Sequence, residues 1–135
     1  MIYGIGTDIV RVARMRESLD CHGDKFARRL LTPDEFEDFQ RDPRPAHFLA
    51  KRFAAKEAAA KALGTGFSSG LFPSQIGVTH DANGKPMLVY LGRAAELCRS
   101  LGISTSHISL ADEEDHAVAF VTLLCDGNLD AAVPT

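Results

Sequence analysis

One segment constrains the fold more than any other. From His47 to Leu63 the chain is rich in alanine, lysine and other strong helix formers, a composition that predicts one long helix. Gly64-Thr65-Gly66 follows directly and predicts the end of that helix and a flexible loop, because glycine is favoured at a helix C-terminus. We therefore expect a long helix at the centre of the fold.

Strands and shorter helices are predicted around this helix. Residues 2–10 are apolar and β-branched, as in a buried strand, and Thr32-Pro33-Asp34-Glu35 forms a capping-box signature at the start of a short helix. Asn83-Gly84 is a favoured tight-turn pair between two strand-like runs. The expected elements are a strand at 2–10, a helix from 12 to about 19, a helix from 32 through 39, strands at 76–81 and 86–91, a helix from about 93 to 101, and strands at 103–111 and 117–125.

This mixture favours an α+β fold with a largely antiparallel sheet packed with the long central helix. A chain of 135 residues falls in the single-domain range, and it contains no internal repeat or low-complexity linker. We expect one domain over residues 1–125, followed by a C-terminal tail at 126–135 without a clear pattern.

The sequence argues against several classes of protein. No apolar run approaches the roughly 20 residues that a membrane-spanning helix requires, and the N-terminus does not resemble an export signal, so we expect a cytoplasmic protein without a membrane partner. The three scattered cysteines, Cys21, Cys98 and Cys125, fit neither a disulfide framework nor a zinc site. We expect free thiols.

Charge is unevenly distributed along the chain. Residues 1–62 hold 12 of the 15 Lys and Arg against 10 of the 18 Asp and Glu, a net +2, and the remainder holds 3 against 8, a net −5. This imbalance is too small for a general nucleic-acid binder, so we expect no nucleic-acid partner. An acidic protein partner is easier to reconcile with it.

Asp8 is the first candidate for chemistry, because it lies inside an otherwise apolar strand. On a two-residue period it shares a face with Gly4 and Gly6, whose missing side chains leave room beside it. A buried carboxylate is costly unless it is paired or binds a metal, which favours a site. The alternative is that Asp8 ends the strand and caps the following helix.

Glu57 and Lys61 are the second candidates, four residues apart on one face of the long helix. Magnesium prefers one or two carboxylates completed by water and phosphate oxygens, which suits Asp8 with Glu57, and a lysine adds a point charge for phosphate. The alternative is an ordinary solvated Glu–Lys pair worth a few tenths of a kcal/mol.

The remaining candidates have simpler explanations available. Gly64-Thr65-Gly66 is too short for a Walker-type phosphate loop, and a plain helix cap explains it equally well. His107 alternates with Ser109 on a strand and could face a pocket or be structural. Turn geometry is enough to explain the hairpin residues. The early basic residues are explained by a solvated face, with a binding patch as the alternative. These residues are Lys85 and Pro86 in the hairpin, and Arg14, Lys25 and Arg28 among the basic ones.

Two blocks of sequence resemble the acyl-carrier-protein synthase family of 4'-phosphopantetheinyl transferases. The first is Gly4-Ile5-Gly6-Thr7-Asp8-Ile9-Val10 with Arg14 shortly after it, and the second runs almost unbroken from Arg52 to Gly66. Asn83-Gly84-Lys85-Pro86 and His107-Ile108-Ser109-Leu110 follow in the order that the family shows. The resemblance covers roughly residues 1 to 125 and rests on motifs too long for chance agreement.

The resemblance implies the activity and the site. The family transfers phosphopantetheine from coenzyme A to a serine of apo acyl carrier protein, with Mg²⁺ between the aspartate and glutamate that match Asp8 and Glu57. The matching Lys61 is associated with the coenzyme A phosphates and the leaving group, and Arg14 with the acidic carrier protein. The resemblance also implies a homotrimer whose active sites are shared between neighbouring subunits.

Three departures from the family pattern stand out. Residue 11 is arginine where many members have an acidic residue, Ala111-Asp112 replaces a serine or threonine followed by histidine, and the tail from 126 to 135 extends beyond the usual end. The second departure puts only a role for a second histidine in doubt.

The mechanism expected from this resemblance is attack of the carrier serine on the β-phosphorus of coenzyme A beside Mg²⁺, with Lys61 stabilising the departing 3',5'-ADP. Arg52, Lys85, Pro86, His107 and the Gly64-Thr65-Gly66 loop are further candidates for contacts to coenzyme A, and Lys25 and Arg28 for contacts to the carrier. The general base stays open between Glu57, Asp8 and a metal-bound water. Two alternative functions stay open beside the transferase. One is a non-catalytic module that binds coenzyme A or the carrier protein, and the other is a magnesium-dependent phosphohydrolase.

Overall fold

The structure is a computed structural model that describes residues 1–126. Its elements, in chain order, are β1 (Ile2–Arg11), α1 (Val12–His22), α2 (Asp24–Leu30), α3 (Pro33–Arg41), α4 (Pro45–Leu63), the 3₁₀ turn η1 (Pro73–Gln75), β2 (Ile76–His80), β3 (Pro86–Tyr90), α5 (Gly92–Leu101), β4 (Ile103–Asp112) and β5 (His116–Cys125). The tail predicted at 126–135 lies almost wholly outside the described residues. None of the helices in the described part is long and apolar enough to cross a membrane.

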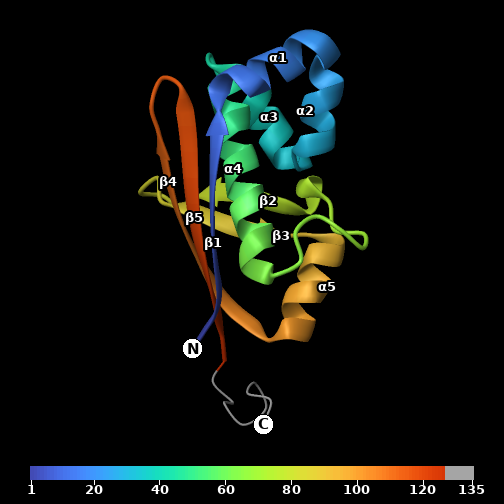
Figure 1. Ribbon diagram of the computed structural model, residues 1–135, viewed down its shortest axis with the longest axis vertical. Coiled ribbons are helices and arrows are strands. Elements are labelled where there is room, and N and C mark those ends of the chain that lie inside the picture. The colour runs from blue at the N-terminus through green and yellow to red at the C-terminus, as the bar shows by residue number, and fades with distance from the viewer. Residues whose placement is uncertain (127–135) are drawn as a thin grey trace.

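Helix α4 is the centre of the fold, as predicted. Most of its side chains are buried, and it packs against β1, β5, α1 and β2 (Figure 1). Pro45 occupies the first turn, where its missing N–H costs nothing, so the helix starts two residues earlier than predicted. It ends at Gly64, whose φ of 86° is a left-handed conformation that glycine adopts without strain.

Both sheets are antiparallel, in agreement with the predicted α+β class. The long strands form one sheet in the order β1-β5-β4, which covers one side of α4, and β2 pairs with β3 in a separate hairpin (Figure 1). Helices α1, α2 and α3 gather at one end of α4, and α5 lies toward the other end. The predicted strands thus exist but divide between two sheets.

Two glycines in β1 allow the sheet to pack closely on α4. A Cβ atom at Gly4 would lie 2.1 Å from the carbonyl oxygen of Ala62, and one at Gly6 would lie 2.0 Å from that of Ala58. Either distance is far inside van der Waals contact. The room that Gly4 and Gly6 leave is therefore filled by the backbone of α4.

Local signals in the sequence account for most element boundaries. The capping box is present: Thr32 accepts a hydrogen bond from the backbone N–H of Glu35, and the Glu35 carboxylate accepts one from the N–H of Thr32. The expected short helix at 12–19 continues to His22, and Gly23, at a φ of 59°, separates it from α2, which the sequence reading missed. Cys21, Cys98 and Cys125 are free thiols, as predicted.

Candidate active site

Strand β1 and helix α4 bring Asp8, Glu57 and Lys61 together. Asp8 lies on the face of β1 that packs on α4, two residues from Gly6, so the close approach of the two elements brings it to the helix surface. The Nζ of Lys61 donates to Oδ1 of Asp8 at 3.0 Å and to the carbonyl oxygen of Thr7 at 3.0 Å. The aspartate side chain is only 17% exposed and the lysine 53%, so the ion pair lies at the rim of the site.

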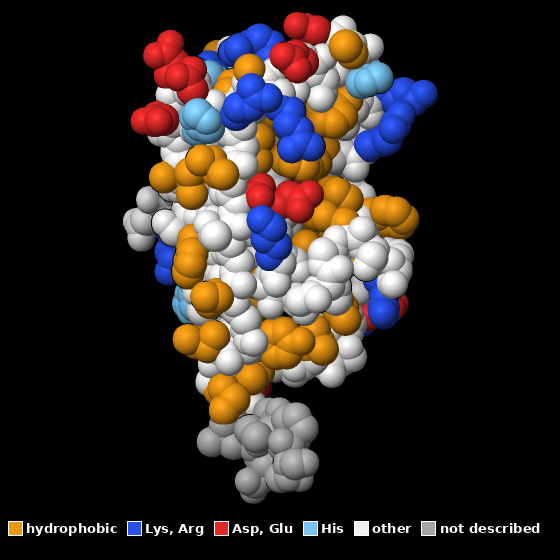
Figure 2. Space-filling model, viewed as in Figure 1, with side chains coloured by type: hydrophobic (Ala, Val, Ile, Leu, Met, Phe, Trp, Pro, Cys, Tyr) orange, Lys and Arg blue, Asp and Glu red, His pale blue; other side chains and the backbone are white. Residues whose placement is uncertain are grey.

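Glu57 completes the acidic group. Its pKa is raised above the usual value, first by partial burial and then by the negative charge of Asp8, while Lys61 and Arg14 oppose the shift. The Asp8 carboxylate is therefore close enough to disfavour the ionisation of Glu57. On the face seen in Figure 2, acidic side chains lie near the middle, with basic side chains above and below them.

These contacts argue against the simpler alternatives for Asp8 and Lys61. Helix α1 begins at Val12 with Arg11 at the N-cap and without a side-chain cap, so Asp8 does not cap it. Lys61 forms its ion pair with Asp8 on a different element, which is more than a solvated pair within one helix. The catalytic and metal-binding roles of both residues stay predictions.

The donor set of Asp8 and Glu57 fits a divalent cation. Burial and the charge of Asp8 both raise the pKa of Glu57, and a hard cation between the two carboxylates would offset that cost. Mg²⁺ commonly takes one or two carboxylates, with water and phosphate oxygens in its other positions. Within residues 1–126 no group of three or more His, Cys, Asp or Glu side chains is placed to hold a metal. Asp8 and Glu57 alone would leave most coordination positions of such a cation to water and to substrate oxygens.

The loop after α4 has the geometry of a helix cap. The backbone N–H of Gly66 donates to the carbonyl oxygen of Ala60 at 3.2 Å, and that of Gly64 to Lys61 at 3.0 Å. Thr65 is exposed, and its hydroxyl donates to the carbonyl oxygen of Gly66 at 2.9 Å. This places the loop one turn beyond Lys61, while its predicted role in binding coenzyme A stays a prediction.

Basic side chains on α1 and α2 border the acidic group. Arg14 lies over the ring of Phe53, 5.1 Å from its centroid, and is close enough to Glu57 to oppose the rise in the pKa of that carboxyl. On α2, Lys25 and Arg28 are exposed, and the guanidinium of Arg28 lies 4.1 Å from the ring centroid of Phe36. All three predicted carrier-binding residues thus belong to the helical end of the molecule.

Arg52 and Pro86 line a hollow on the other flank of α4. This hollow, which we call the Arg52 hollow, has a volume of about 530 Å³, and its lining includes Asp38, Phe48, Lys51, Arg52, His80, Gly84 and Pro86. Arg52 is 5% exposed, and burial lowers its pKa while the carboxylate of Glu35 opposes that shift. Lys85 is exposed in the adjoining turn, where its backbone N–H donates to Oδ1 of Asp81 at 2.9 Å.

His107 lies on neither of these surfaces. It pairs with Thr122 in the β4–β5 register and is exposed, on the face of the sheet that points away from α4. Asp8 points to the opposite face of the same sheet. Within one chain the structure therefore does not bring His107 to the acidic group.

The predicted site residues accordingly form separate groups. Arg52 and Glu57 are five residues apart, which at ~100° per residue places them ~140° apart around α4. One flank carries Glu57 and Lys61 toward β1, and the other carries Arg52 toward the β2–β3 hairpin. A single chain presents the two groups in different directions.

The sequence reading missed a buried charged pair beneath the site. Lys56 is completely buried, and its Nζ donates to Oε1 of Glu35 at 2.6 Å. Burial lowers the pKa of Lys56, and the Glu35 carboxylate counters that shift. One signal could have revealed it: Lys56 lies seven residues from both Leu49 and Leu63, so it shares the buried face of the helix with them.

Comparisons with known proteins agree on one family. The model of the 4'-phosphopantetheinyl transferase superfamily matches residues 4–121. A holo-[acyl-carrier-protein] synthase of Nitrosococcus oceani is 61% identical over 126 residues, 93% of this chain and 82% of that protein.

Two solved structures are similar over nearly the whole chain. The crystal structure of holo-[acyl-carrier-protein] synthase from Neisseria meningitidis has a TM-score of 0.86 at 47% identity and covers 92% of this chain and 99% of its own. A holo-(acyl-carrier-protein) synthase from Bacillus anthracis, in complex with coenzyme A (3',5'-ADP), has a TM-score of 0.77 at 35% identity and covers 93% and 99%.

Proposed function

The chain belongs to the 4'-phosphopantetheinyl transferase superfamily, and on that premise we propose how its residues perform the reaction. The reaction is transfer of the 4'-phosphopantetheine group from coenzyme A to a serine of apo acyl carrier protein, giving the holo protein and adenosine 3',5'-bisphosphate. The observation that carries the assignment of residues is the meeting of Asp8, Glu57 and Lys61 between β1 and α4.

Asp8 and Glu57 are the residues that would hold Mg²⁺. When bound, Mg²⁺ supplies charge neutralisation for the pyrophosphate of coenzyme A as the carrier serine attacks the β-phosphorus. The new bond joins the serine oxygen to that phosphorus, and the serine proton passes to a general base, for which Glu57 and Asp8 are the candidates on this chain. The bond from phosphorus to the bridging oxygen breaks, so the negative charge leaves on 3',5'-ADP. Support for this assignment comes from the paired carboxylates and from the raised pKa of Glu57.

Lys61 would stabilise the leaving group. It is half exposed and is held by Asp8 and by the carbonyl oxygen of Thr7, so its ammonium group is pre-positioned beside the two carboxylates. A fixed positive charge where negative charge develops is an efficient form of catalysis, because no reorganisation is needed during the reaction.

The carrier protein would dock on the helical end, where Arg14, Lys25 and Arg28 are exposed. An apolar groove of about 490 Å³, lined partly by Phe26, Phe53 and Phe72, lies between α2, α4 and the segment before η1. Acidic and apolar side chains of a carrier helix would suit this surface, with the charges guiding association and the groove receiving apolar side chains.

We further propose that the chain is a homotrimer in which neighbouring subunits complete each site. The outer face of the long sheet exposes large apolar side chains, among them Ile5 at 59%, Ile9 at 65% and Phe120 at 45%. An apolar face of this kind favours an interface with another chain. Assembly would also explain why Arg52, Lys85, Pro86 and His107 face away from Asp8 within one chain.

The test of the reaction is analysis of the nucleotide product. The protein is incubated with coenzyme A and Mg²⁺, with and without apo acyl carrier protein, and the nucleotides are separated by liquid chromatography. Release of 3',5'-ADP only when the carrier is present supports transfer. Release without the carrier indicates a phosphohydrolase, and binding of coenzyme A without any release indicates the non-catalytic module.

A further inference from the structure

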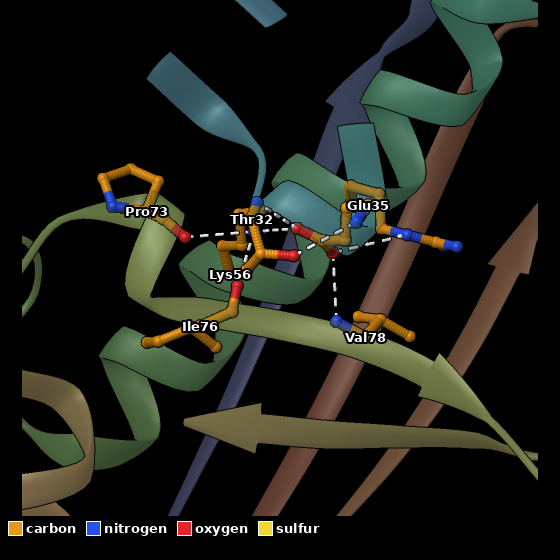
Figure 3. A network of polar contacts seen from close by, with 7 residues as sticks. Thr32, Glu35, Lys56, Pro73, Ile76 and Val78 are labelled. Carbon is orange, nitrogen blue, oxygen red and sulfur yellow. Dashed lines mark hydrogen bonds and ion pairs between the residues drawn. The ribbon is translucent and has the colours of Figure 1, made fainter. Parts of the chain in front are cut away.

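Glu35 is the centre of a buried polar network that joins three elements (Figure 3). Its Oε1 accepts from the N–H of Thr32 at 3.0 Å and from the Nζ of Lys56 at 2.6 Å. Its Oε2 accepts from the N–H of Val78 in β2 at 3.0 Å. The carboxylate therefore fixes the start of α3, the middle of α4 and strand β2 relative to one another.

The same carboxylate touches the arginine of the Arg52 hollow. The Nε of Arg52 lies 3.4 Å from Oε2 of Glu35, an ion pair without the alignment of a hydrogen bond. On its other side the guanidinium lies over the ring of Phe48, 4.4 Å from the centroid. Arg52 is thus held between a carboxylate and an aromatic ring at the wall of the hollow.

The charges in this network are unequal. One buried carboxylate faces two buried cations, because Glu35, Lys56 and Arg52 are exposed by only 1%, 0% and 5%. Lys56 is further held by the carbonyl oxygens of Pro73 and Ile76, to which its Nζ also donates. Lys56 neutralises Glu35, so the net positive charge of the group is carried by Arg52 toward the hollow.

Strand β2 connects a second part of the wall of the hollow to Glu35. Val78 is two residues before His80 in β2, Gly84 lies in the turn that follows, and Pro86 begins β3. His80, Gly84 and Pro86 line the hollow together with Arg52. Because Glu35 holds both β2 and Arg52, a change in its position would alter both walls together.

We propose that Glu35 is a positioning residue for the transfer reaction, which holds Arg52 and the β2–β3 hairpin in a fixed relation at the Arg52 hollow, with Lys56 as its buried counter-charge. The inference rests on the proposed role of Arg52 in binding coenzyme A and adds a residue with no contact to substrate of its own. Glu35 acts through Arg52, so the loss of Glu35 weakens the binding of coenzyme A more than the binding of the carrier.

The direct substitution Glu35→Gln leaves two buried cations uncompensated and can prevent folding. The informative variant is therefore Glu35→Gln/Lys56→Met, which removes one charge of each sign. Its control is Lys56→Met alone, which leaves Glu35 and Arg52 as a balanced pair. We expect the double variant to raise the KM for coenzyme A by about tenfold, equivalent to losing one charge-assisted contact, and Lys56→Met to leave it within about twofold.

A double-mutant cycle with Arg52→Met separates positioning from general damage to the fold. If Glu35 acts through Arg52, the Glu35→Gln/Lys56→Met change has no further effect on the KM for coenzyme A once Arg52 is methionine. The KM for the carrier stays unchanged throughout. The same cycle is measured without catalysis, as binding of coenzyme A by calorimetry in chelator, so that the result does not depend on the metal.

Leu49→Ala serves as the matched control for lost stability, because Leu49 is fully buried on the same face of α4 as Lys56 and its side chain is apolar. An additive cycle, or an equal rise in the KM for coenzyme A in Leu49→Ala, overturns the inference. Glu35→Asp, which keeps the charge and withdraws the carboxylate, is measured in the same way and covers the case of an unfolded double variant. Failure of the wild-type protein to load any carrier would instead contradict the proposed function itself.

Discussion

Glu57 lies where partial burial and a second carboxylate both oppose its ionisation. Replacing it by glutamine removes one of the two carboxylates proposed to hold Mg²⁺ but keeps the shape of the side chain. We expect Glu57→Gln to abolish transfer while the circular dichroism spectrum is unchanged. Glu37→Gln, at an exposed position on α3, is the matched control and keeps wild-type turnover. Normal magnesium-dependent turnover in Glu57→Gln would refute the metal assignment.

The raised pKa of Glu57 also predicts a pH dependence of stability. Between its usual value near 4.5 and the raised value, the folded protein binds more protons at this group than the unfolded chain does. The contribution of Glu57 to the free energy of unfolding therefore falls as the pH rises through that window. Urea titrations across it, without metal, should show this decrease in the wild type relative to Glu57→Gln, and parallel curves would contradict the prediction.

Lys61 contributes a charge at the rim of the site and little to the core. Because it is half exposed, Lys61→Met should change the unfolding midpoint only slightly. We expect it to lower kcat by on the order of 10²-fold, since it removes a fixed charge beside the leaving group. Stopped-time transfer assays at saturating coenzyme A measure this, and turnover within twofold of the wild type would remove Lys61 from the mechanism.

At the scale of elements, the contact between β1 and α4 sets the distance from Asp8 to Glu57. A methyl group at Gly6 would meet the carbonyl oxygen of Ala58, so Gly6→Ala must push the strand from the helix. We expect a loss of about 1–3 kcal/mol or more in the free energy of unfolding, together with loss of transfer. Chemical denaturation measures the free energy of unfolding.

The nature of this clash gives the prediction a specific control. Because the clashing atom belongs to the backbone, the added substitution Ala58→Gly should not restore stability or transfer. Rescue by Ala58→Gly would show that side-chain crowding, and not the close backbone contact, explains the effect of Gly6→Ala.

Signals that are local in sequence predicted the elements well. The alanine-rich run, the capping box at Thr32 and the Asn83-Gly84 turn each depend on neighbouring residues, and the structure contains the corresponding helix, cap and hairpin. Helix α2 was missed because it is a short segment that starts directly after Gly23. The division into two sheets depends on contacts between distant strands, for which the local pattern holds no information.

The candidate site could be predicted only in part from the residues. Spacing placed Glu57 and Lys61 on one helix face. Their proximity to Asp8 is a tertiary contact, which the spacing could not predict and only the family resemblance implied. The Glu35 network was not predicted because a lysine in a helix is usually solvated. Only the seven-residue spacing of Lys56 from Leu49 and Leu63 indicates that Lys56 is buried.

At the scale of the whole molecule, the exposed apolar face of the long sheet is the basis of the proposed trimer. Ile5→Lys places a charge on that face, where it would be buried by a neighbouring subunit, so we expect dissociation to monomers and loss of transfer. Leu91→Lys, at the exposed apolar N-cap position just before α5, is the control and keeps both properties. Light scattering after size exclusion measures the mass, and a wild-type monomer with full activity would contradict the shared site.

The most direct test of the central claim is the intact mass of an apo acyl carrier protein after incubation with this protein and coenzyme A, with Mg²⁺ and with chelator in parallel. The account predicts a gain of one phosphopantetheine that requires Mg²⁺ and disappears when the carrier serine is replaced by alanine. An unchanged carrier mass across several carriers, with a folded protein that binds coenzyme A, would contradict it.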